Sequence, residues 1–243
     1  PGVSTAMTDR PAVHALIPAA RTSVRFGGTT LKQYAHLLGT PVIAHSIEAL
    51  HRHPMVSSVT VALPPDDGIF EHLIRPSWPD VRTVTGGDSR PQTVMNGLDL
   101  IRSQEPECDW VLVHDAARPC LTRAALNRLL EQGLASESGA ILARPVHDTL
   151  KRADDGGHIE RTGDRTHYWS AQTPQLFPIE LLASHLRSAL RVGRVPTDEA
   201  AAMEFAGVHP LLVEGPPTNI KITGAEDLSL AEYILRHQAV QDL

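Results

Sequence analysis

The residues best suited to chemistry are cations and small residues that follow predicted strands. A loop after the first apolar run holds Gly27 and Gly28, and three cations bracket it: Arg21, Arg25 and Lys32. Backbone N–H groups and cations together suit a triphosphate, so we expect this loop to bind one. The sequence contains neither the Walker A pattern GxxxxGKS/T nor the dinucleotide pattern GxGxxG. From spacing alone, an ordinary surface loop with solvated charges is an equally good interpretation.

A second candidate segment is the run from Gly86 to Arg90, which leads from a short strand into a helix. The paired glycines Gly86 and Gly87 allow a flat ligand such as a base to approach the backbone closely. Taken alone, the segment is explained more simply as a strand-to-helix turn that Asp88 or Ser89 caps.

A third segment, His114 to Arg118, follows the strand that ends at Val113. An aspartate at the carboxyl end of a strand can hold Mg²⁺ or a ribose hydroxyl, which makes Asp115 a candidate ligand. An ion pair between Asp115 and Arg118 is the structural alternative. We expect His114 to be a buried, hydrogen-bonded histidine rather than a base.

Two polar segments near the C-terminus receive different interpretations. Thr197, followed by Asp198 and Glu199, is typical of a helix N-cap with acidic residues in the first turn. Lys221 lies in a short apolar run beside a turn, where a cation needs an anionic partner.

The elements that must position these residues alternate between strand-length apolar runs and segments of helical period. Strands are predicted at 12–18, 58–63, 81–85, 110–113, 139–146, 210–213 and 219–222. Helices are predicted at 41–52, from 89 onward, and at 122–135, 179–191, 197–205 and 223–238, the last one with a capping box of Thr223 and Glu226. This alternation favours an α/β fold with a mainly parallel sheet, helices on both faces, and ligands beyond the carboxyl ends of the strands.

The segment from His147 to Arg165 breaks the alternation. It places Asp155-Gly156-Gly157 between two short polar stretches, which predicts a protruding hairpin without a core face. We expect one domain over 11–243, preceded by a flexible stretch at 1–10.

Composition narrows the classes of partner. Of 243 residues, 42% are hydrophobic and 21% are charged, as in ordinary globular proteins. A formal net charge of −6 disfavours general attraction to nucleic acid or anionic lipid. Cys108 and Cys120 fall in no metal-ligand spacing and favour a reducing compartment. Neither a signal peptide nor an apolar run of the ~20 residues needed to span a bilayer is present, so we expect a cytoplasmic protein without membrane contact.

Taken in order, these motifs resemble the 2-C-methyl-D-erythritol 4-phosphate cytidylyltransferases of the non-mevalonate isoprenoid pathway. The likeness runs from about Val13 to Val240. The motifs that carry it are Pro18-Ala19-Ala20 with Arg25 and Lys32-Gln33-Tyr34, the run 86–90, the run 111–118, Asp148-Thr149, Thr173-Pro174-Gln175, Thr197-Asp198-Glu199 and Asn219-Ile220-Lys221.

The resemblance implies a Rossmann-like nucleotidyltransferase fold in which a β-hairpin arm at 147–172 joins two subunits into a homodimer. It implies that CMP passes from CTP, with Mg²⁺, to 2-C-methyl-D-erythritol 4-phosphate. The products would be 4-diphosphocytidyl-2-C-methyl-D-erythritol and pyrophosphate. The partners would thus be two small molecules and a second copy of the chain, with neither nucleic acid nor membrane.

The resemblance also implies roles for individual residues. The catalytic residues would be Arg25, Lys32, Arg165 and Lys221. The nucleotide would be held by Pro18, Ala19, Ala20, Gly87, Asp88, Arg90, Thr93 and Ala116. The alcohol phosphate would be held by Asp115, Arg118, Thr149, Arg165, Thr173, Thr197 and Lys221, and Asp115 would also hold the metal ion. Because the arm crosses to the other subunit, Arg165 and Thr173 would serve the neighbour's site.

The first loop departs from the family pattern, which usually has glycines in place of Arg21 and Ser23 and a proline in place of Leu31. A side chain in a left-handed conformation costs roughly 1 kcal/mol, so we predict that Arg21 leaves this loop mobile without substrate. Three other functions stay open: a ribitol-5-phosphate cytidylyltransferase, a catalytically impaired nucleotide-binding relative, and a nicotinamide dehydrogenase. The missing GxGxxG pattern disfavours the dehydrogenase.

Overall fold

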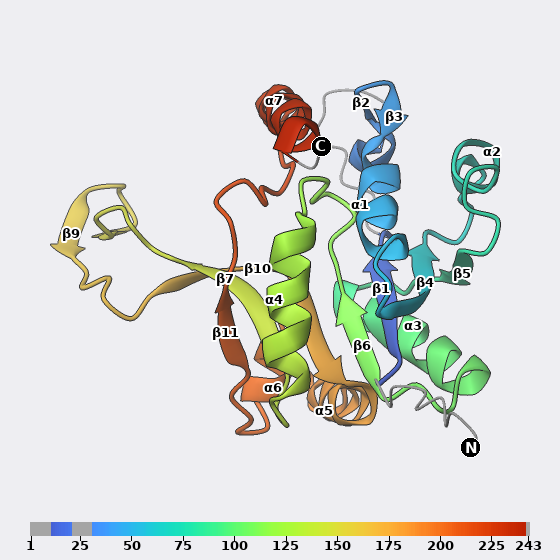
Figure 1. The fold of residues 1–243 in the computed structure, drawn as a ribbon. Coiled ribbons are helices and arrows are strands. Elements are labelled where there is room, and N and C mark those ends of the chain that lie inside the picture. The colour runs from blue at the N-terminus through green and yellow to red at the C-terminus, as the bar shows by residue number, and fades with distance from the viewer. Residues whose placement is uncertain (1–10, 21–30, 242–243) are drawn as a thin grey trace, which may run out of the picture.

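The computed structural model describes residues 11–20 and 31–241, and its centre is a seven-stranded sheet (Figure 1). Its strands are β1 (Val13–Pro18), β4 (Val56–Leu63), β5 (Arg82–Thr85), β6 (Trp110–Val113), β7 (Ala140–Pro145), β10 (Trp169–Pro178) and β11 (Leu211–Glu214). They lie in the order β11-β7-β10-β6-β1-β4-β5. Strand β10 pairs antiparallel with both of its neighbours, and the other pairs are parallel. The predicted α/β class with a mainly parallel sheet is therefore confirmed.

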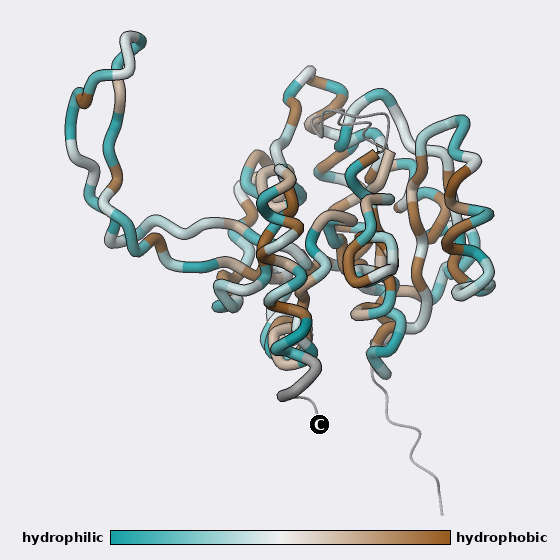
Figure 2. The backbone as a smooth tube through the Cα atoms, turned by 90° about the horizontal axis from the view of Figure 1, so that it is seen from above, coloured by the Kyte–Doolittle hydropathy of each residue, from teal (hydrophilic) through white to brown (hydrophobic). Residues whose placement is uncertain are grey.

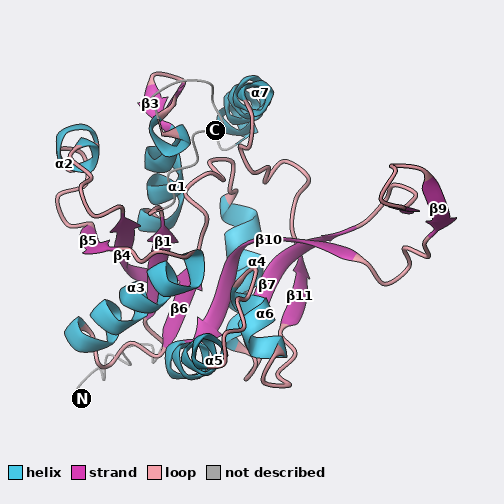
Figure 3. Ribbon diagram, turned by 180° about the vertical axis from the view of Figure 1, so that it is seen from behind, coloured by secondary structure: helices cyan, strands magenta, loops and turns pink. Residues whose placement is uncertain are grey.

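Helices cover both faces of this sheet (Figures 1 and 3). They are α1 (Val42–His51), α2 (Ile69–Leu73), α3 (Arg90–Gln104), α4 (Arg123–Leu134), α5 (Ile179–Arg191), α6 (Glu199–Glu204) and α7 (Ala225–Gln241). Strand side chains alternate between the faces, so Ala15 and Ile17 belong to one apolar core and Leu16 to the other. The first core packs against α1 and α4, and the second against α3, α5 and α6.

Two predicted helix starts are confirmed and two are shifted by one residue. Ser89 and Thr122 cap α3 and α4, because their side-chain oxygens accept backbone N–H groups of the first turn. At α6 the cap is Asp198 rather than Thr197. At α7, Asp227 accepts the backbone hydrogen bonds that the predicted capping box assigned to the preceding glutamate.

The sequence pattern does not predict β10, which lies in the middle of the sheet. Pro174 has no N–H for the ladder, and the pairing of β10 with β7 is irregular between Ala171 and Gln175. Both Gln172 and Gln175 are buried, so the strand lacks an apolar run at this point. A polar motif and a central strand therefore share one segment.

The strand predicted at 219–222 is wrong. The backbone carbonyl of Asn219 accepts a hydrogen bond from the Arg118 side chain, and the Ile222 N–H donates to the carbonyl of Ala117. These backbone groups form hydrogen bonds with the loop after β6, so they do not need a neighbouring strand as a partner. It is an ordered loop that leads into α7.

The predicted hairpin is present as an arm that extends away from the sheet (Figure 2). Strands β8 (Lys151–Ala153) and β9 (Ile159–Thr162) pair antiparallel, and all of their residues are exposed. The Asp154 carboxylate orders the turn by accepting from the N–H groups of Gly156 and His158. The extended ends of β7 and β10 carry this arm, since Trp169 pairs with Pro145.

Two short strands, β2 (His36–Leu37) and β3 (Thr40–Pro41), form a second hairpin before α1. A single turn of 3-10 helix, η1 (Lys32–Tyr34), precedes them. Within the described part of the chain, no helix is long and apolar enough to cross a membrane.

Candidate functional site

The candidate site lies where the strand order reverses. From β1 the chain adds β4 and β5 on one side, and later adds β6 on the other. A crevice therefore opens beyond the carboxyl ends of β1 and β6, as expected for an open α/β sheet. A cavity of about 340 Å³ lies there. It is lined by Pro18, Ala19, Ala20, Lys32, Gln33, Arg90, Thr93, Asp115, Ala116, Ala117, Lys221 and Thr223.

Asp115, one of the lining residues, lies close to three cations. Its Oδ2 lies 2.7 Å from Lys221 Nζ and 3.7 Å from Arg118 Nε, and its Oδ1 lies 3.3 Å from Arg90 Nη2. Burial alone would raise the pKa of Asp115, but the charges of Arg90 and Lys221 outweigh burial and hold this pKa below its ordinary value. The carboxylate is therefore ionised at neutral pH. The predicted need of Lys221 for an anionic partner is met by Asp115.

Arg90 is held by a carboxylate that sequence analysis did not select. Both Nη atoms of Arg90 bind Glu199, at 2.6 and 3.0 Å, and Glu199 is only 2% exposed. Burial alone would lower the pKa of Arg90, but the charges of Glu199 and Asp115 raise it. Arg90 lines the pocket, yet both Nη atoms of its guanidinium already bind the Glu199 carboxylate. With the additional contact to Asp115, both Nη atoms of Arg90 are thus engaged by carboxylates.

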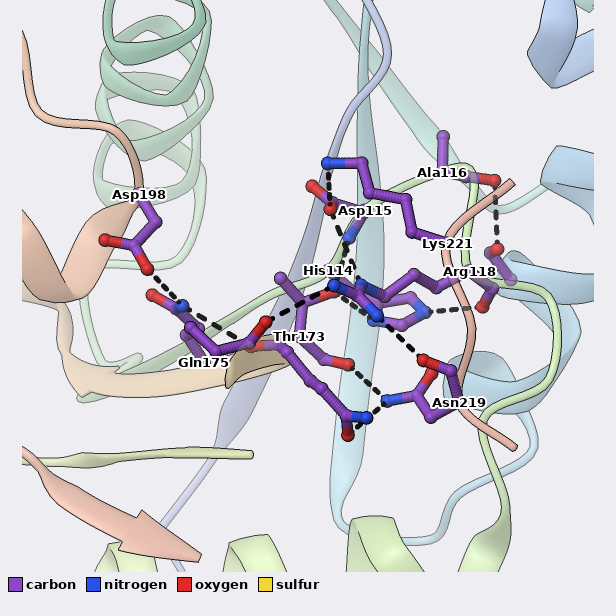
Figure 4. Close-up of polar contacts among 12 residues, drawn as sticks. His114, Asp115, Ala116, Arg118, Thr173, Gln175, Asp198, Asn219 and Lys221 are labelled. Carbon is purple, nitrogen blue, oxygen red and sulfur yellow. Dashed lines mark hydrogen bonds and ion pairs between the residues drawn. The ribbon is translucent and has the colours of Figure 1, made fainter. Parts of the chain in front are cut away.

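A layer of hydrogen bonds lies beneath Asp115 (Figure 4). The prediction for His114 is confirmed: the ring is fully buried, with Nδ1 3.0 Å from Thr173 Oγ1 and Nε2 3.1 Å from the carbonyl of Arg118. Burial lowers the pKa of His114 to about 4, so the ring is neutral at pH 7. It has no free nitrogen with which to act as a base.

Small residues shape the other wall of the pocket. Ala19 lies at the end of β1, where its carbonyl accepts a hydrogen bond of 3.1 Å from the buried side chain of Gln33. The Thr93 hydroxyl lies 3.1 Å from the N–H of Gly87 and 2.9 Å from the carbonyl of Ser89. Through these two hydrogen bonds, the Thr93 hydroxyl fixes the backbone of the turn between β5 and α3.

The glycine at position 86 is required by close packing. A Cβ added there would lie 2.2 Å from Ala20 Cβ. We expect Gly86→Ala to displace the pocket wall, lower stability by about 1–3 kcal/mol and raise the KM for the nucleotide. Gly68→Ala is the matched control, since no atom lies within 4 Å of the added Cβ. Urea unfolding and initial rates check both variants, and equal behaviour of the two would contradict this packing argument.

Several predicted site residues lie elsewhere. Thr149 and Arg165 are exposed on the arm, and the Arg165 guanidinium donates to the carbonyl of His147. Gly87, Asp88 and Thr197 do not line the pocket, and the last two are exposed. Arg118 lies below the pocket, where it donates to the carbonyl of Asn219 at 2.7 Å.

Thr173, which the resemblance assigns to the neighbour's site, contacts Asp115 of its own chain. Its side chain is 4% exposed, and its hydroxyl accepts a 3.0 Å hydrogen bond from the N–H of Asp115 in the same chain. Thr173 is therefore joined to a pocket residue of its own chain.

The loop at 21–30 lies outside the described residues, so the predictions for Arg21, Ser23 and Arg25 lie outside them too. Leu31, which the structure does describe, has φ −64° and ψ 134°. This φ is the value that proline imposes. The leucine at position 31 therefore keeps a backbone that also suits the family's proline.

Sequence analysis missed Gln33, Ala117, Glu199 and Thr223 as parts of the site. The first two lie inside motifs that were recognised, so their neighbours were a usable signal. Glu199 also lies inside a recognised motif, Thr197-Asp198-Glu199, but that pattern is equally typical of an ordinary helix start with first-turn acids. Its role depends on how α6 packs near α3.

Comparisons with known proteins agree on one family. The family model described as 2-C-methyl-D-erythritol 4-phosphate cytidylyltransferase matches residues 13–237. A curated protein of that name from Shewanella oneidensis is 47% identical over 223 residues, which are 92% of this chain and 88% of the relative. Another, from Yersinia pseudotuberculosis serotype I, is 48% identical over 226 residues, covering 93% and 92% respectively.

Solved structures agree with this match. A crystal structure of 4-diphosphocytidyl-2C-methyl-D-erythritol synthase is similar with a TM-score of 0.81 at 39% identity, covering 93% of this chain and 99% of that chain. The 2-C-methyl-D-erythritol 4-phosphate cytidylyltransferase of Francisella tularensis is similar with a TM-score of 0.77 at 31% identity, covering 92% and 99%.

Proposed function

Since the chain belongs to the 2-C-methyl-D-erythritol 4-phosphate cytidylyltransferase family, we propose that the pocket around Asp115 is where it transfers CMP from CTP to 2-C-methyl-D-erythritol 4-phosphate. The chain is thus a cytidylyltransferase of isoprenoid biosynthesis. A phosphate oxygen of the alcohol phosphate attacks the α-phosphorus of CTP. The bond from that phosphorus to the β-phosphate oxygen breaks, and pyrophosphate leaves.

This reaction requires neutralisation of the phosphate charges rather than a strong base. The attacking phosphate is already ionised near pH 7, and both reactants are anionic. Catalysis then consists of positioning the two phosphates and neutralising their charge. This mechanism requires no base, which is consistent with His114: both of its ring nitrogens are hydrogen-bonded and the ring is neutral. Lys32 and Lys221 line the pocket and supply cations there, and we assign the same task to Arg25.

The observation that carries the proposal is the distribution of cations around Asp115. Arg90 is committed to Glu199, and Arg118 to the backbone of the 219–222 loop. Lys221 is 42% exposed in its side chain and lines the pocket. Lys221 can therefore turn from Asp115 to an incoming phosphate, because Arg90 and Arg118 remain to neutralise the aspartate.

Mg²⁺ fits this pocket as a companion of CTP. Among the described residues, no group of three or more His, Cys, Asp or Glu side chains is placed to hold a metal ion. Proteins often hold Mg²⁺ through one or two carboxylates together with substrate phosphates, and Asp115 is the carboxylate that lines the pocket. Bound to the triphosphate, Mg²⁺ would neutralise part of its charge.

A cytoplasmic location is part of the proposal. Cys108 and Cys120 are both buried free thiols, which suits a reducing compartment.

The choice of alcohol phosphate tests the proposal. With CTP and Mg²⁺, we expect release of pyrophosphate to depend on 2-C-methyl-D-erythritol 4-phosphate and to be far slower with ribitol 5-phosphate. Equal rates with the two alcohols, or a faster rate with ribitol 5-phosphate, would contradict the assignment.

The arm supports a homodimer with shared sites. Thr149 and Arg165 do not line the pocket of their own chain, and β8 and β9 have no core face. A two-fold dimer would let each arm reach the partner's pocket, and the exchange would be reciprocal. Each site would then combine Lys32 of one chain with Arg165 of the other.

We expect Lys32→Ala and Arg165→Ala to be nearly inactive alone and to complement each other after co-refolding. In a mixed dimer, one site carries both lesions and the other carries none. With random pairing, about half of the dimers are mixed, so roughly a quarter of all sites regain function. The measurement is CTP-dependent pyrophosphate release, with a mass tag on one variant to count mixed dimers.

The matched control is the pair Lys32→Ala and Lys221→Ala. Both side chains line the same pocket of one chain, so mixing should leave one lesion in every site. If the Lys32 and Arg165 variants recovered no more activity than this control, with mixed dimers present, the shared site would be refuted.

A further inference from the structure

Lys32 reaches the pocket from the single turn η1, which has few backbone hydrogen bonds of its own. The N–H of Tyr34 donates to the carbonyl of Leu31 at 2.9 Å. The N–H of Ala35 donates to the carbonyl of Lys32 at 3.2 Å. Among the described residues, no side chain caps this turn. Because so short a helix fixes several dihedral angles for few bonds, contacts with the rest of the fold must hold it in place.

The first of these contacts is made by the side chain of Gln33, a residue that is 3% exposed. Its Nε2 donates to the carbonyl of Ala19 at 3.1 Å, and the N–H of Ala19 donates to the carbonyl of Ala62 at 2.8 Å. Gln33 therefore joins the turn to the end of β1. It also lines the pocket, so a substitution at this position would change the pocket surface itself.

The second contact is made by the hydroxyl of Tyr34, a residue that is 2% exposed. This hydroxyl donates at 2.6 Å to Oδ2 of Asp67, in the loop between β4 and α2. The other oxygen of Asp67, Oδ1, caps α2 by accepting from the N–H groups of Ile69 and Phe70 at 2.9 Å. Burial and the hydrogen bond to Asp67 raise the pKa of Tyr34, so its hydroxyl remains a donor. The turn is thus joined to a second element of the fold.

We propose that Tyr34 and Asp67 are positioning residues, whose hydrogen bond holds Lys32 where it meets the substrate phosphates. Neither Tyr34 nor Asp67 lines the pocket, so the proposal gives neither of them a contact with substrate. Charge stabilisation in a transition state depends on donors that are already in place. Loss of the bond would let η1 shift and carry the Lys32 ammonium away from that place. The inference rests on the proposed function, which gives Lys32 its catalytic role.

Tyr34→Phe tests the proposal, because it removes the hydroxyl and keeps the buried ring. We expect kcat to fall by about tenfold, a typical effect of losing one hydrogen bond to a charged group, with a smaller change in the KM for CTP. Tyr233→Phe is the matched control, since Tyr233 is 61% exposed on α7 and does not line the pocket. It should leave kcat unchanged. An unchanged kcat in Tyr34→Phe would overturn the proposal.

A second variant, Asp67→Ser, removes the same bond from its acceptor side. Serine caps helices about as well as aspartate does, so α2 keeps its cap. The single side-chain oxygen of serine is used by that cap, which leaves Tyr34 without its acceptor. We expect the same loss of about tenfold in kcat, and no larger loss when both substitutions are combined. A combined loss of about a hundredfold would show that the two residues do not act as a pair.

The decisive comparison places Tyr34→Phe in the Lys32→Ala background. If Tyr34 acts through Lys32, the second change should lower kcat by less than about twofold, because the group that it positions is already gone. A general structural defect would instead lower kcat by about tenfold in either background. That result would contradict a positioning role.

A readout that does not depend on activity follows the lysine side chains. The sequence contains three lysines, Lys32, Lys151 and Lys221, so NMR of lysine-labelled protein separates them, and Lys32→Ala identifies the signal of Lys32. Without substrate, we expect Tyr34→Phe to shift the Lys32 signal and to leave the signal of Lys151, on the arm, in place. An unshifted Lys32 signal would overturn the proposal. Failure of the wild-type protein to release pyrophosphate would instead refute the proposed function, so the two failures are distinguishable.

Discussion

Lys32→Ala is expected to lower kcat by about 10²–10³-fold, the usual cost of losing a donor that stabilises charge in a transition state. Lys32 begins the η1 turn and lines the same pocket as Asp115 and Lys221. Because it lies in the site rather than in a core, we expect a change in the free energy of unfolding below about 1 kcal/mol.

The matched control for this prediction is Arg187→Ala. Arg187 is an exposed cation on α5 that pairs with Asp99 at 3.0 Å, and it does not line the pocket. Its loss removes the same charge from the protein and should leave kcat nearly unchanged. Initial rates with saturating CTP compare the two variants, and an unchanged kcat for Lys32→Ala would refute its catalytic role.

The second large effect concerns stability. Glu199→Ala is expected to lower the free energy of unfolding by about 3–5 kcal/mol, because it removes the buried bidentate partner of a partly buried guanidinium. Among the residues that the structure describes, the carboxylate left to Arg90 would be Asp115, at 3.3 Å. That contact would draw the aspartate away from Lys221, so we also expect lower activity in whatever protein remains folded.

Glu204→Ala provides the control on the same helix. Glu204 ends α6, is exposed, and should change stability by no more than about 0.5 kcal/mol. Urea unfolding at one fixed protein concentration measures both variants, since association would make stability depend on concentration. A loss below about 1 kcal/mol for Glu199→Ala would show that Arg90 finds another partner.

Much of the pocket could be predicted from the sequence because it lies in strand-to-helix segments. Asp115 follows an apolar strand, and a parallel sheet brings such positions to one edge. The sequence also predicted that Lys221 needs an anion, and Asp115 is that anion at 2.7 Å. A single rule about strand ends therefore located the pocket.

The remaining features depend on contacts between distant segments. Glu199 and Arg90 are far apart in the sequence, and only the packing of α6 near α3 brings them together. Strand β10 is interrupted by Pro174 and buries glutamines, so no apolar alternation marks it. The hydrogen bonds of the Thr173 hydroxyl to His114 and Asp115 likewise join β10 to the end of β6, segments far apart in the sequence.

The comparisons also exclude one of the alternative functions that the sequence left open. The nicotinamide dehydrogenase is excluded by membership of the cytidylyltransferase family, and a match over residues 13–237 leaves little of the chain unaccounted for. The departures at Arg21 and Ser23 lie in the loop at 21–30, so turnover rather than similarity measures their effect.

The central claim is that the substrate phosphate attacks the α-phosphorus of CTP and is kept in the product. The most direct measurement uses 2-C-methyl-D-erythritol 4-phosphate with ¹⁸O in its phosphate, together with CTP and Mg²⁺, and mass spectrometry of the products. We predict that all of the label stays in a cytidine diphosphate ester of the alcohol and that none enters pyrophosphate. Label in pyrophosphate, or release of free CMP without the labelled ester, would contradict the account.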